Sequence, residues 1–367
     1  MLINVIIPSY NYGRFLEISV SSVLNQNCAD LRIIIVDDGS VDNTKEICKA
    51  MAEKDKRITY IYQQNGGVSS ARNKGIEYVL KNRQGFEYIA FLDADDLWRK
   101  DFFNQKVISI IEEKNDIIGF EMCRCAHNLK KVSEEYELLE TPFGKPAEKE
   151  YRVIRGGAES VRCHENSPMG AMLYSADLLK KTGIRFFSGL KFSEDKIFKM
   201  QCLYAAKEIA LLKRVMYLYR ANESSAMKTV KFDSKYYIPI IDAYIKCDRQ
   251  MQYLKDTDAG ELCWGRTLAS LYTTEMIDEH FRFFGKEDEI RKVLDDNPYF
   301  VENLRDFAFY DERIQNWIDA VKSSKQKYIA RQRIIGIKHR AIEIAKSSAV
   351  LRKIKDKKTY SLENIYI

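Results

Sequence analysis

The sequence is poor in the features that mark several classes of protein. No apolar run approaches the ~18 residues that a membrane-spanning helix needs. The N-terminus runs directly into a strand-like segment, without the basic stretch that opens a secretory leader, so we expect a cytoplasmic protein. Only six prolines occur in 367 residues, which leaves little material for long linkers. The chain is therefore predicted to be globular, with one large domain and an appendage.

Several kinds of active site are also missing. A Gly-x-Gly-x-x-Gly loop does not follow the first strand-like run, where residues 8–13 read Pro-Ser-Tyr-Asn-Tyr-Gly, and this excludes a dinucleotide-binding unit. No Walker A loop occurs, and the four scattered histidines form no triad with a serine or cysteine. The eight cysteines sit mostly among apolar neighbours, as reduced core residues do. What remains is chemistry based on carboxylates.

Positive charge is concentrated near the C-terminus. Residues 325–358 hold 12 Lys and Arg against two acidic residues, a local charge of +10, so the rest of the chain carries −4. Apolar residues at helical spacing predict a basic amphipathic tail over 323–367. Either this tail lies on the anionic inner face of the plasma membrane, or its apolar stripe packs on helices predicted over 231–322. We expect no nucleic-acid partner, because Tyr328 is the only aromatic residue among these cations.

Strand-like and helix-like patterns alternate along the first hundred residues. The strand-like runs are 2–7, 31–36, 58–62 and 88–92. A helical pattern follows each of the first three. This order predicts an α/β fold with a doubly wound, mostly parallel sheet and helices on both faces. Further on, strands are predicted at 116–122 and 169–174, an irregular polar insertion at 128–165, and a helical extension from about 235.

The last of these four strands ends in a cluster of acids. The run 88–92 is followed by Asp93, Asp95 and Asp96, whose charges repel one another unless a cation is bound. Ligands of open α/β sheets bind beyond the carboxyl ends of the strands, and carboxylates there suit Mg²⁺ or Mn²⁺ with a phosphate-bearing ligand. The alternative is a solvated acidic turn, in which Asp95 or Asp96 caps the next helix.

A second acidic pair opens a later helix. Glu194 and Asp195 fall in the first helical turn, where the helix dipole favours acids whether or not they have a function. Polar and small residues also end the other early strands, and parallel strands bring these ends to one edge of the sheet. The sequence therefore predicts one polar site at that edge.

Taken together, these motifs resemble the family 2 glycosyltransferases of the GT-A fold. Four of them occur in the order of that family: Pro8–Asn11, Val36–Ser40, Asn65–Asn73 and Leu92–Asp96. The resemblance continues through Tyr174, 178–186, Ser193–Asp195, Tyr217–Arg220 and Ser224–Ser225. It implies a GT-A catalytic domain over residues 1–230, a helical C-terminal region over 231–322 and the tail over 323–367.

The resemblance implies a reaction and roles for individual residues. A sugar would move from a nucleotide-diphosphate sugar, with a UDP-sugar as the first expectation, to a hydroxyl of a glycan or lipid-linked glycan, with inversion. Asp95 would bind the Mn²⁺ or Mg²⁺ that bridges the donor diphosphate. Asp195 would act as general base on the acceptor hydroxyl, and Glu194 would orient the acceptor or Asp195.

Donor binding is implied for a larger set. Pro8 and Tyr10 would line the nucleobase pocket, and Asp38, with Asp37, would hydrogen-bond the base. Arg72 would face the nucleotide or donor sugar, and Asp93 the ribose or sugar. The full donor-binding set is Pro8, Tyr10, Asn11, Asp37, Asp38, Gly66, Arg72, Asp93, Arg220 and Ser225.

One position departs from the family pattern. Many relatives supply a late histidine to the metal, but no histidine lies between His164 and His280. Arg220 and Ser225 are instead expected to clamp the diphosphate, and the identity of the third metal ligand stays open.

Three other functions are considered for the whole chain: a nucleotidyltransferase, a nucleotide- or nucleic-acid-binding protein that uses the tail, and an inactive scaffold. A nucleotidyltransferase would need a Gly-rich basic N-terminal loop, which this chain lacks. Asp95 and Asp195 argue against the scaffold.

Overall fold

A computed structural model describes residues 1–26, 30–100, 102–125, 151–157, 160, 169–190 and 193–220, with isolated positions at 239, 243, 246 and 296. The chain divides into two compact units, 1–280 and 281–367, and nearly all described residues belong to the first. Apart from those isolated positions, the predicted helical region over 231–322 and the basic tail over 323–367 lie outside the described residues. Within the described part of the chain, no helix has both the length and the apolar character to cross a bilayer.

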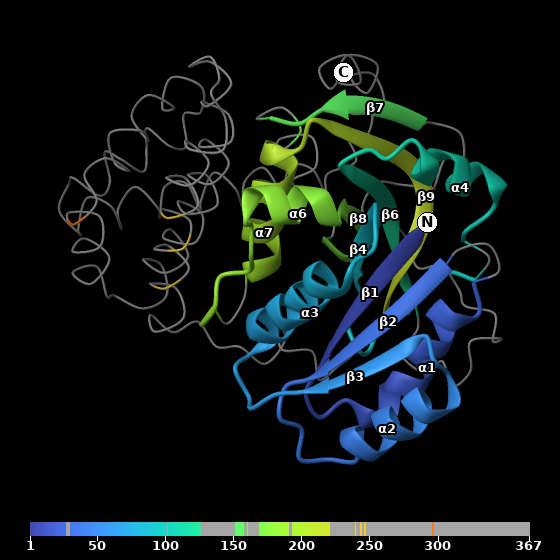
Figure 1. Cartoon of the computed structure of the whole chain (residues 1–367), viewed down its shortest axis with the longest axis vertical. Helices are drawn as coiled ribbons and strands as arrows, with labels where there is room; N and C mark the ends of the chain where they lie inside the picture. The colour runs from blue at the N-terminus through green and yellow to red at the C-terminus, as the bar shows by residue number, and fades with distance from the viewer. Residues whose placement is uncertain are drawn as a thin grey trace, which may run out of the picture. The chain divides into compact units, whose positions relative to one another are not determined.

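The N-terminal half is a parallel α/β unit, as predicted (Figure 1). Its strands are β1 (Leu2–Ser9), β2 (Asp30–Asp37), β3 (Ile58–Tyr62) and β4 (Glu87–Phe91), paired in the order β3-β2-β1-β4. The connecting helices are α1 (Gly13–Leu24), α2 (Thr44–Lys54) and α3 (Val68–Asn82). All three pairings are parallel, so the carboxyl ends of these strands meet at one edge.

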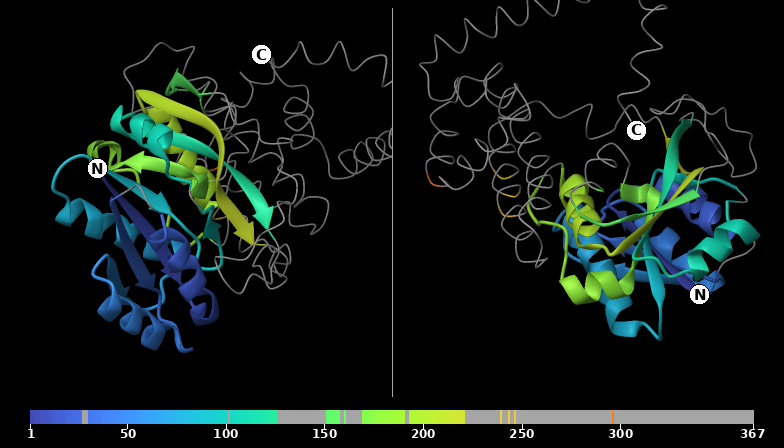
Figure 2. Two further views of the ribbon diagram at one scale, coloured as in Figure 1. Left: turned by 90° about the vertical axis from the view of Figure 1, so that its right-hand side faces the viewer. Right: turned by 90° about the horizontal axis from the view of Figure 1, so that it is seen from above.

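The second half of the sheet is mixed. It adds β5 (Leu97–Trp98), β6 (Ile117–Cys125), β7 (Tyr151–Arg155), β8 (Met172–Ser175) and β9 (Glu208–Arg220). β8 is antiparallel to both neighbours, β4 and β6, whereas β6 and β9 are parallel. The order is β3-β2-β1-β4-β8-β6-β9-β5, with β7 on β9 (Figure 2). The predicted fold class is confirmed, with a sheet that is parallel at one end and mixed at the other.

Helices cover both faces of the sheet and bury two separate cores. Because side chains alternate along a strand, Val5 and Ile7 of β1 face one core and Ile6 faces the other. The first core packs against α1, α2 and α4 (Gln105–Glu112). The second packs against α3, α6 (Ala176–Thr182) and α7 (Glu194–Ala205). Burial on both faces explains why the sequences of β1, β2 and β4 are largely apolar.

Three strands were not predicted, and one of them is the two-residue β5. β7 lies inside the segment 128–165, which was read as irregular, and β9 was not recognised as a strand. β9 pairs with β5, β6 and β7, and a bulge in the β6–β9 ladder lies between Gly119 and Met122. Its C-terminal end pairs with β5, which follows directly after the acidic cluster of β4. β9 therefore brings residues 217–220 to the edge where the polar site was predicted.

Candidate active site

A cavity of about 420 Å³ opens at the carboxyl ends of β1, β2 and β4. The predicted site residues that line it are Pro8, Tyr10, Asp38, Arg72, Asp93, Asp95, Glu194 and Asp195. Segments as distant in sequence as 8–12 and 193–195 therefore meet in one cavity. The lining residues to which no individual role was assigned from the sequence include Tyr12, Asp96, Ser193 and Tyr219.

Two residues that were predicted to bind the donor, Asn11 and Asp37, do not line the cavity. The side-chain oxygen of Asn11 accepts from the Val41 backbone N–H (2.8 Å), and the Asn11 N–H donates to Ser40 Oγ (2.9 Å). The buried carboxylate of Asp37 accepts from the Ser40 N–H (2.9 Å) and from the Tyr60 hydroxyl (2.8 Å). Asn11 and Asp37 thus join the loops after β1 and β2 and fix β3, which differs from the donor contacts predicted for them.

Asp38 fastens the glycine-rich loop to the end of β2. Its carboxylate accepts from the backbone N–H groups of Gly66 (2.9 Å) and Gly67 (2.7 Å) and from Gln63 Nε2 (2.6 Å). Gly67 has a φ of +86°, which favours glycine. Gly66, predicted to bind the donor, does not line the cavity and acts here through its backbone amide. Asp38 itself lines the cavity, so it can hold the loop and still face a ligand.

Asp38→Ala should lower the free energy of unfolding by about 1–3 kcal/mol, because it removes three hydrogen bonds to a carboxylate. Urea denaturation would measure this. Asp30→Ala is the matched control, since its carboxylate is 80% exposed and pairs only weakly with the N-terminal amine (3.4 Å). It should change stability by less than about 1 kcal/mol. Equal losses in the two variants would show that Asp38 does not fasten the loop.

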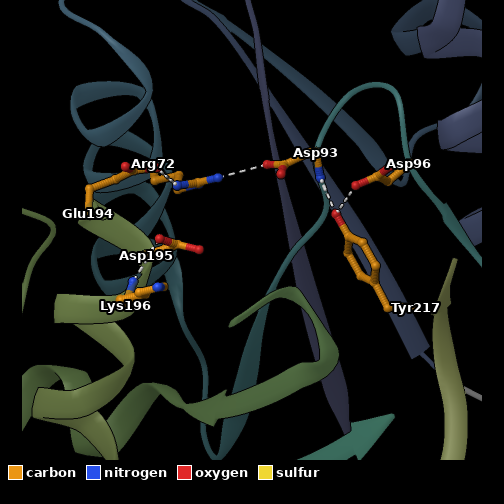
Figure 3. Close-up of polar contacts among 7 residues, drawn as sticks. All are labelled: Arg72, Asp93, Asp96, Glu194, Asp195, Lys196 and Tyr217. Carbon is orange, nitrogen blue, oxygen red and sulfur yellow. Dashed lines mark hydrogen bonds and ion pairs between the residues drawn. The ribbon is translucent and has the colours of Figure 1, made fainter. Parts of the chain in front are cut away.

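Arg72 bridges two carboxylates across the cavity (Figure 3). Its Nη2 donates to Asp93 Oδ1 (2.8 Å) and its Nη1 to Glu194 Oε1 (2.9 Å). The guanidinium also lies 5.2 Å from the ring centre of Phe186. Burial acts to lower the pKa of Arg72, but Asp93 and Glu194 outweigh it and raise that pKa above its ordinary value. Arg72 therefore stays charged and ties the end of β4 to the start of α7.

The two acids of α7 have different surroundings. Glu194 is buried and is held by Arg72, while burial and the charge of Asp195 raise its pKa. Asp195 is more exposed, and one of its oxygens accepts from the Lys196 N–H (2.8 Å). Its other oxygen points toward the centre of the site in Figure 3. Of the two, Asp195 is the carboxylate available to a ligand, and Glu194 belongs to the ion pair.

The acidic cluster forms a turn at the end of β4. The Asp96 N–H donates to the Asp93 carbonyl (3.0 Å), and the Asp96 side chain is 1% exposed. Burial and the charges of Asp95 and Asp93 raise the pKa of Asp96 well above its usual range. The alternative in which Asp95 or Asp96 caps the next helix is wrong, because Asn104 caps α4 by accepting from the Val107 N–H (3.0 Å).

Arg220 and Ser225 were predicted to clamp a diphosphate. Arg220 is buried outside the cavity lining, and its guanidinium lies 5.2 Å from the ring centre of Phe15. Its backbone N–H donates to Asp96 Oδ1 (2.8 Å). Ser225 lies outside the described residues. The structure thus connects Arg220 to the acidic turn rather than to the cavity.

The cavity fits a cation that is shared with a ligand better than a resident ion. Among the described residues, no group of three or more His, Cys, Asp or Glu side chains is placed to hold a metal. Asp95 lines the cavity beside the 43% exposed carboxylate of Asp93, so the available donors are oxygens. Mg²⁺ in particular is commonly bound by one or two carboxylates together with substrate phosphates and water. Asp95 is suited to that role.

Comparisons with known proteins agree with this geometry. Residues 4–171 match the family model described as Glycosyl transferase family 2. The glycosyltransferase EpsJ of Bacillus subtilis is 30% identical over 227 residues, which cover 61% of this chain and 62% of EpsJ. GgaB of Bacillus subtilis, a minor teichoic acid biosynthesis protein, is 33% identical over 246 residues, or 64% of this chain and 25% of GgaB. The chain thus spans less than two thirds of the length of either relative.

The fold is also found among solved structures. TarS 1–349 of S. aureus in complex with UDP-GlcNAc superimposes with a TM-score of 0.57 at 21% identity, covering 88% of this chain and 84% of TarS 1–349. The complex of TarS 1–349 with UDP gives a TM-score of 0.51 at 21% identity, covering 88% and 83%. At this identity the likeness to TarS concerns the fold alone. By sequence, residues 4–171 match the family 2 glycosyltransferases, and the described part of the chain has a fold like that of TarS 1–349.

Proposed function

We propose that this domain transfers a sugar from a UDP-sugar to a hydroxyl of a glycan or lipid-linked glycan, with inversion at the anomeric carbon. The observation that supports this most is that Asp195 and the acidic turn of β4 line the same cavity. TarS binds UDP-GlcNAc, which supports a UDP-sugar donor here. GgaB belongs to teichoic acid biosynthesis, which supports a glycan-like acceptor.

In the proposed reaction each part of the cavity has one task. Pro8 and Tyr10 contact the nucleobase, and Asp95 would hold Mn²⁺ or Mg²⁺ when the donor is bound. When bound, that cation stabilises negative charge on the leaving UDP. Asp195 accepts the proton of the acceptor hydroxyl. At the same time the hydroxyl oxygen attacks the anomeric carbon, and the bond between that carbon and UDP breaks. A single displacement of this kind inverts the anomeric configuration.

Arg72 and Glu194 hold the general base, Asp195, in position. Glu194 precedes Asp195 in α7, and its ion pair with Arg72 anchors the first turn of that helix against β4 through Asp93. The basic tail over 323–367 is proposed to hold the enzyme at an anionic membrane surface, near a lipid-linked acceptor.

UDP release from a panel of nucleotide sugars tests the donor assignment. The panel would contain UDP-glucose, UDP-galactose and their N-acetylamino forms, with GDP- and dTDP-sugars as controls. We expect release from one or two UDP-sugars, loss of release on chelation, and recovery with Mn²⁺ or Mg²⁺. A preference for a GDP- or dTDP-sugar would contradict the UDP assignment, and full activity in chelator would contradict the metal.

A further inference from the structure

A tyrosine on β9 holds both ends of the acidic turn (Figure 3). The Tyr217 hydroxyl donates to Asp96 Oδ2 (2.6 Å) and accepts from the Asp93 backbone N–H (3.3 Å). Inside the turn, the Asp96 N–H donates to the Asp93 carbonyl (3.0 Å). One hydroxyl therefore bridges the first and last residues of the turn, and Asp95 lies between them.

The ring of Tyr217 is fixed by its packing. It is 4% exposed, and β9 places it opposite Trp98 of β5 and Met122 of β6. A Cβ atom added at Gly170 would lie 2.5 Å from Tyr217 Cε2, so the backbone of Gly170 packs directly on the ring. With the ring immobilised in this way, the hydroxyl occupies a fixed position relative to the turn.

Asp96 is fixed to β9 a second time. Its Oδ1 accepts from the Arg220 backbone N–H (2.8 Å), three residues beyond Tyr217. Asp96 is 1% exposed, so its two hydrogen bonds form with little competition from water. The turn is thus bound to β9 through the Asp96 side chain and through the Asp93 backbone.

We propose that Tyr217 and Asp96 are positioning residues that preset Asp95 for the divalent cation of the donor diphosphate. The inference rests on the proposed function, in which Asp95 is the metal ligand. Groups that hold metal ligands from behind commonly change metal affinity by about 10–100-fold when removed. Tyr217 and Asp96 would support Asp95 in the same way, because they fix the backbone of the turn that carries it.

Tyr217→Phe tests the proposal, because it keeps the ring and removes only the hydroxyl. Calorimetric titration of UDP would be run with and without Mn²⁺. We expect UDP affinity in Mn²⁺ to fall about 10–100-fold, while affinity in chelator stays at the wild-type value. Tyr151→Phe is the matched control. Tyr151 lies on β7, outside the cavity lining, and its hydroxyl also donates to a carboxylate, that of Glu113. It should change neither affinity.

Asp96→Asn provides a second variant, with folding of each checked by thermal unfolding. It keeps an acceptor for Arg220 but leaves the Tyr217 hydroxyl without its carboxylate, so the Mn²⁺-dependent affinity should fall in the same way. Wild-type affinity in both folded variants would overturn the proposal. An equal loss with and without Mn²⁺ would also overturn it, because the pair would then shape the nucleotide pocket in general.

Asp95→Ala separates failure of this inference from failure of the proposed function. If Asp95→Ala removes the Mn²⁺-dependent gain in UDP affinity while Tyr217→Phe and Asp96→Asn keep it, only the positioning role fails. If Asp95→Ala keeps that gain, the metal role of Asp95 fails and the positioning role fails with it.

Discussion

Replacing Asp195 with asparagine should slow UDP release from the preferred UDP-sugar by about 10²–10⁴-fold, the usual contribution of a general base. The amide has the shape of the carboxylate and can still accept from the Lys196 N–H, which lies 2.8 Å from Asp195 Oδ1. It cannot take the proton of the attacking hydroxyl or water. UDP affinity should therefore stay at the wild-type value, and the loss should fall on turnover.

Turnover at saturating donor and UDP affinity by calorimetry would separate these effects. Asp177→Asn is the matched control, because Asp177 also lies in the first turn of a helix, α6, and pairs with Arg83 (2.6 Å) at the surface. It should leave both quantities unchanged. Near-normal turnover in Asp195→Asn would assign the base to another group.

In the parallel half of the fold, β1, β2 and β4 were predictable because they are largely buried on both faces. The run 2–7 falls within β1, and 31–36 falls within β2. Continuous apolar runs that end in turn residues mark such strands clearly. The run 58–62 coincides with the edge strand β3, whose β-branched and aromatic residues favour a strand. In this half, local sequence and tertiary burial favour the same structure.

The strands of the mixed half were harder to predict, because exposed residues interrupt or replace the buried apolar residues in them. In β9, Lys213 and Arg214 interrupt the apolar run, although the residues on both sides of them are buried. β7 pairs only with β9 in the described sheet, and its residues are partly or fully exposed. Strands with an unpaired edge commonly carry charged residues, which makes them look like loops in sequence.

For the site, sequence located the acids but not their partners. It could not distinguish Asp37, which bonds Tyr60 behind the cavity, from Asp38, which lines it. Neighbouring side chains in an extended segment point in opposite directions. Which of the two faces the cavity depends on the surrounding elements of the fold. The pairing of Arg72 with Glu194, 122 positions away, depends on how α3 and α7 pack and has no local signal.

That pairing leads to the largest effect on stability that we expect. Arg72→Met should lower the free energy of unfolding by about 3–5 kcal/mol, the usual loss when one partner of a buried ion pair is removed. Methionine retains an apolar stem next to Phe186. Asp93 is 43% exposed and can be hydrated, whereas the Glu194 side chain is 11% exposed and would be left buried without its cation.

The loss should depend on pH. Burial raises the pKa of Glu194, the charge of Asp195 raises it further, and Arg72 opposes both. Without Arg72 the folded-state pKa rises more, so the folded variant binds a proton that the unfolded chain releases. Such a group contributes stability at low pH that is lost as the pH rises through the folded-state pKa. Arg72→Met should therefore be less destabilising at about pH 5 than at about pH 8.

Urea denaturation of Arg72→Met, Glu194→Gln and the double variant, each at both pH values, would test the cause. Glutamine occupies the place of the glutamate without its charge, so the double variant should regain part of the stability lost in Arg72→Met and lose most of its pH dependence. A double variant as unstable as Arg72→Met, with the same stability at both pH values, would show that the loss comes from packing around Phe186 and not from the unpaired carboxylate.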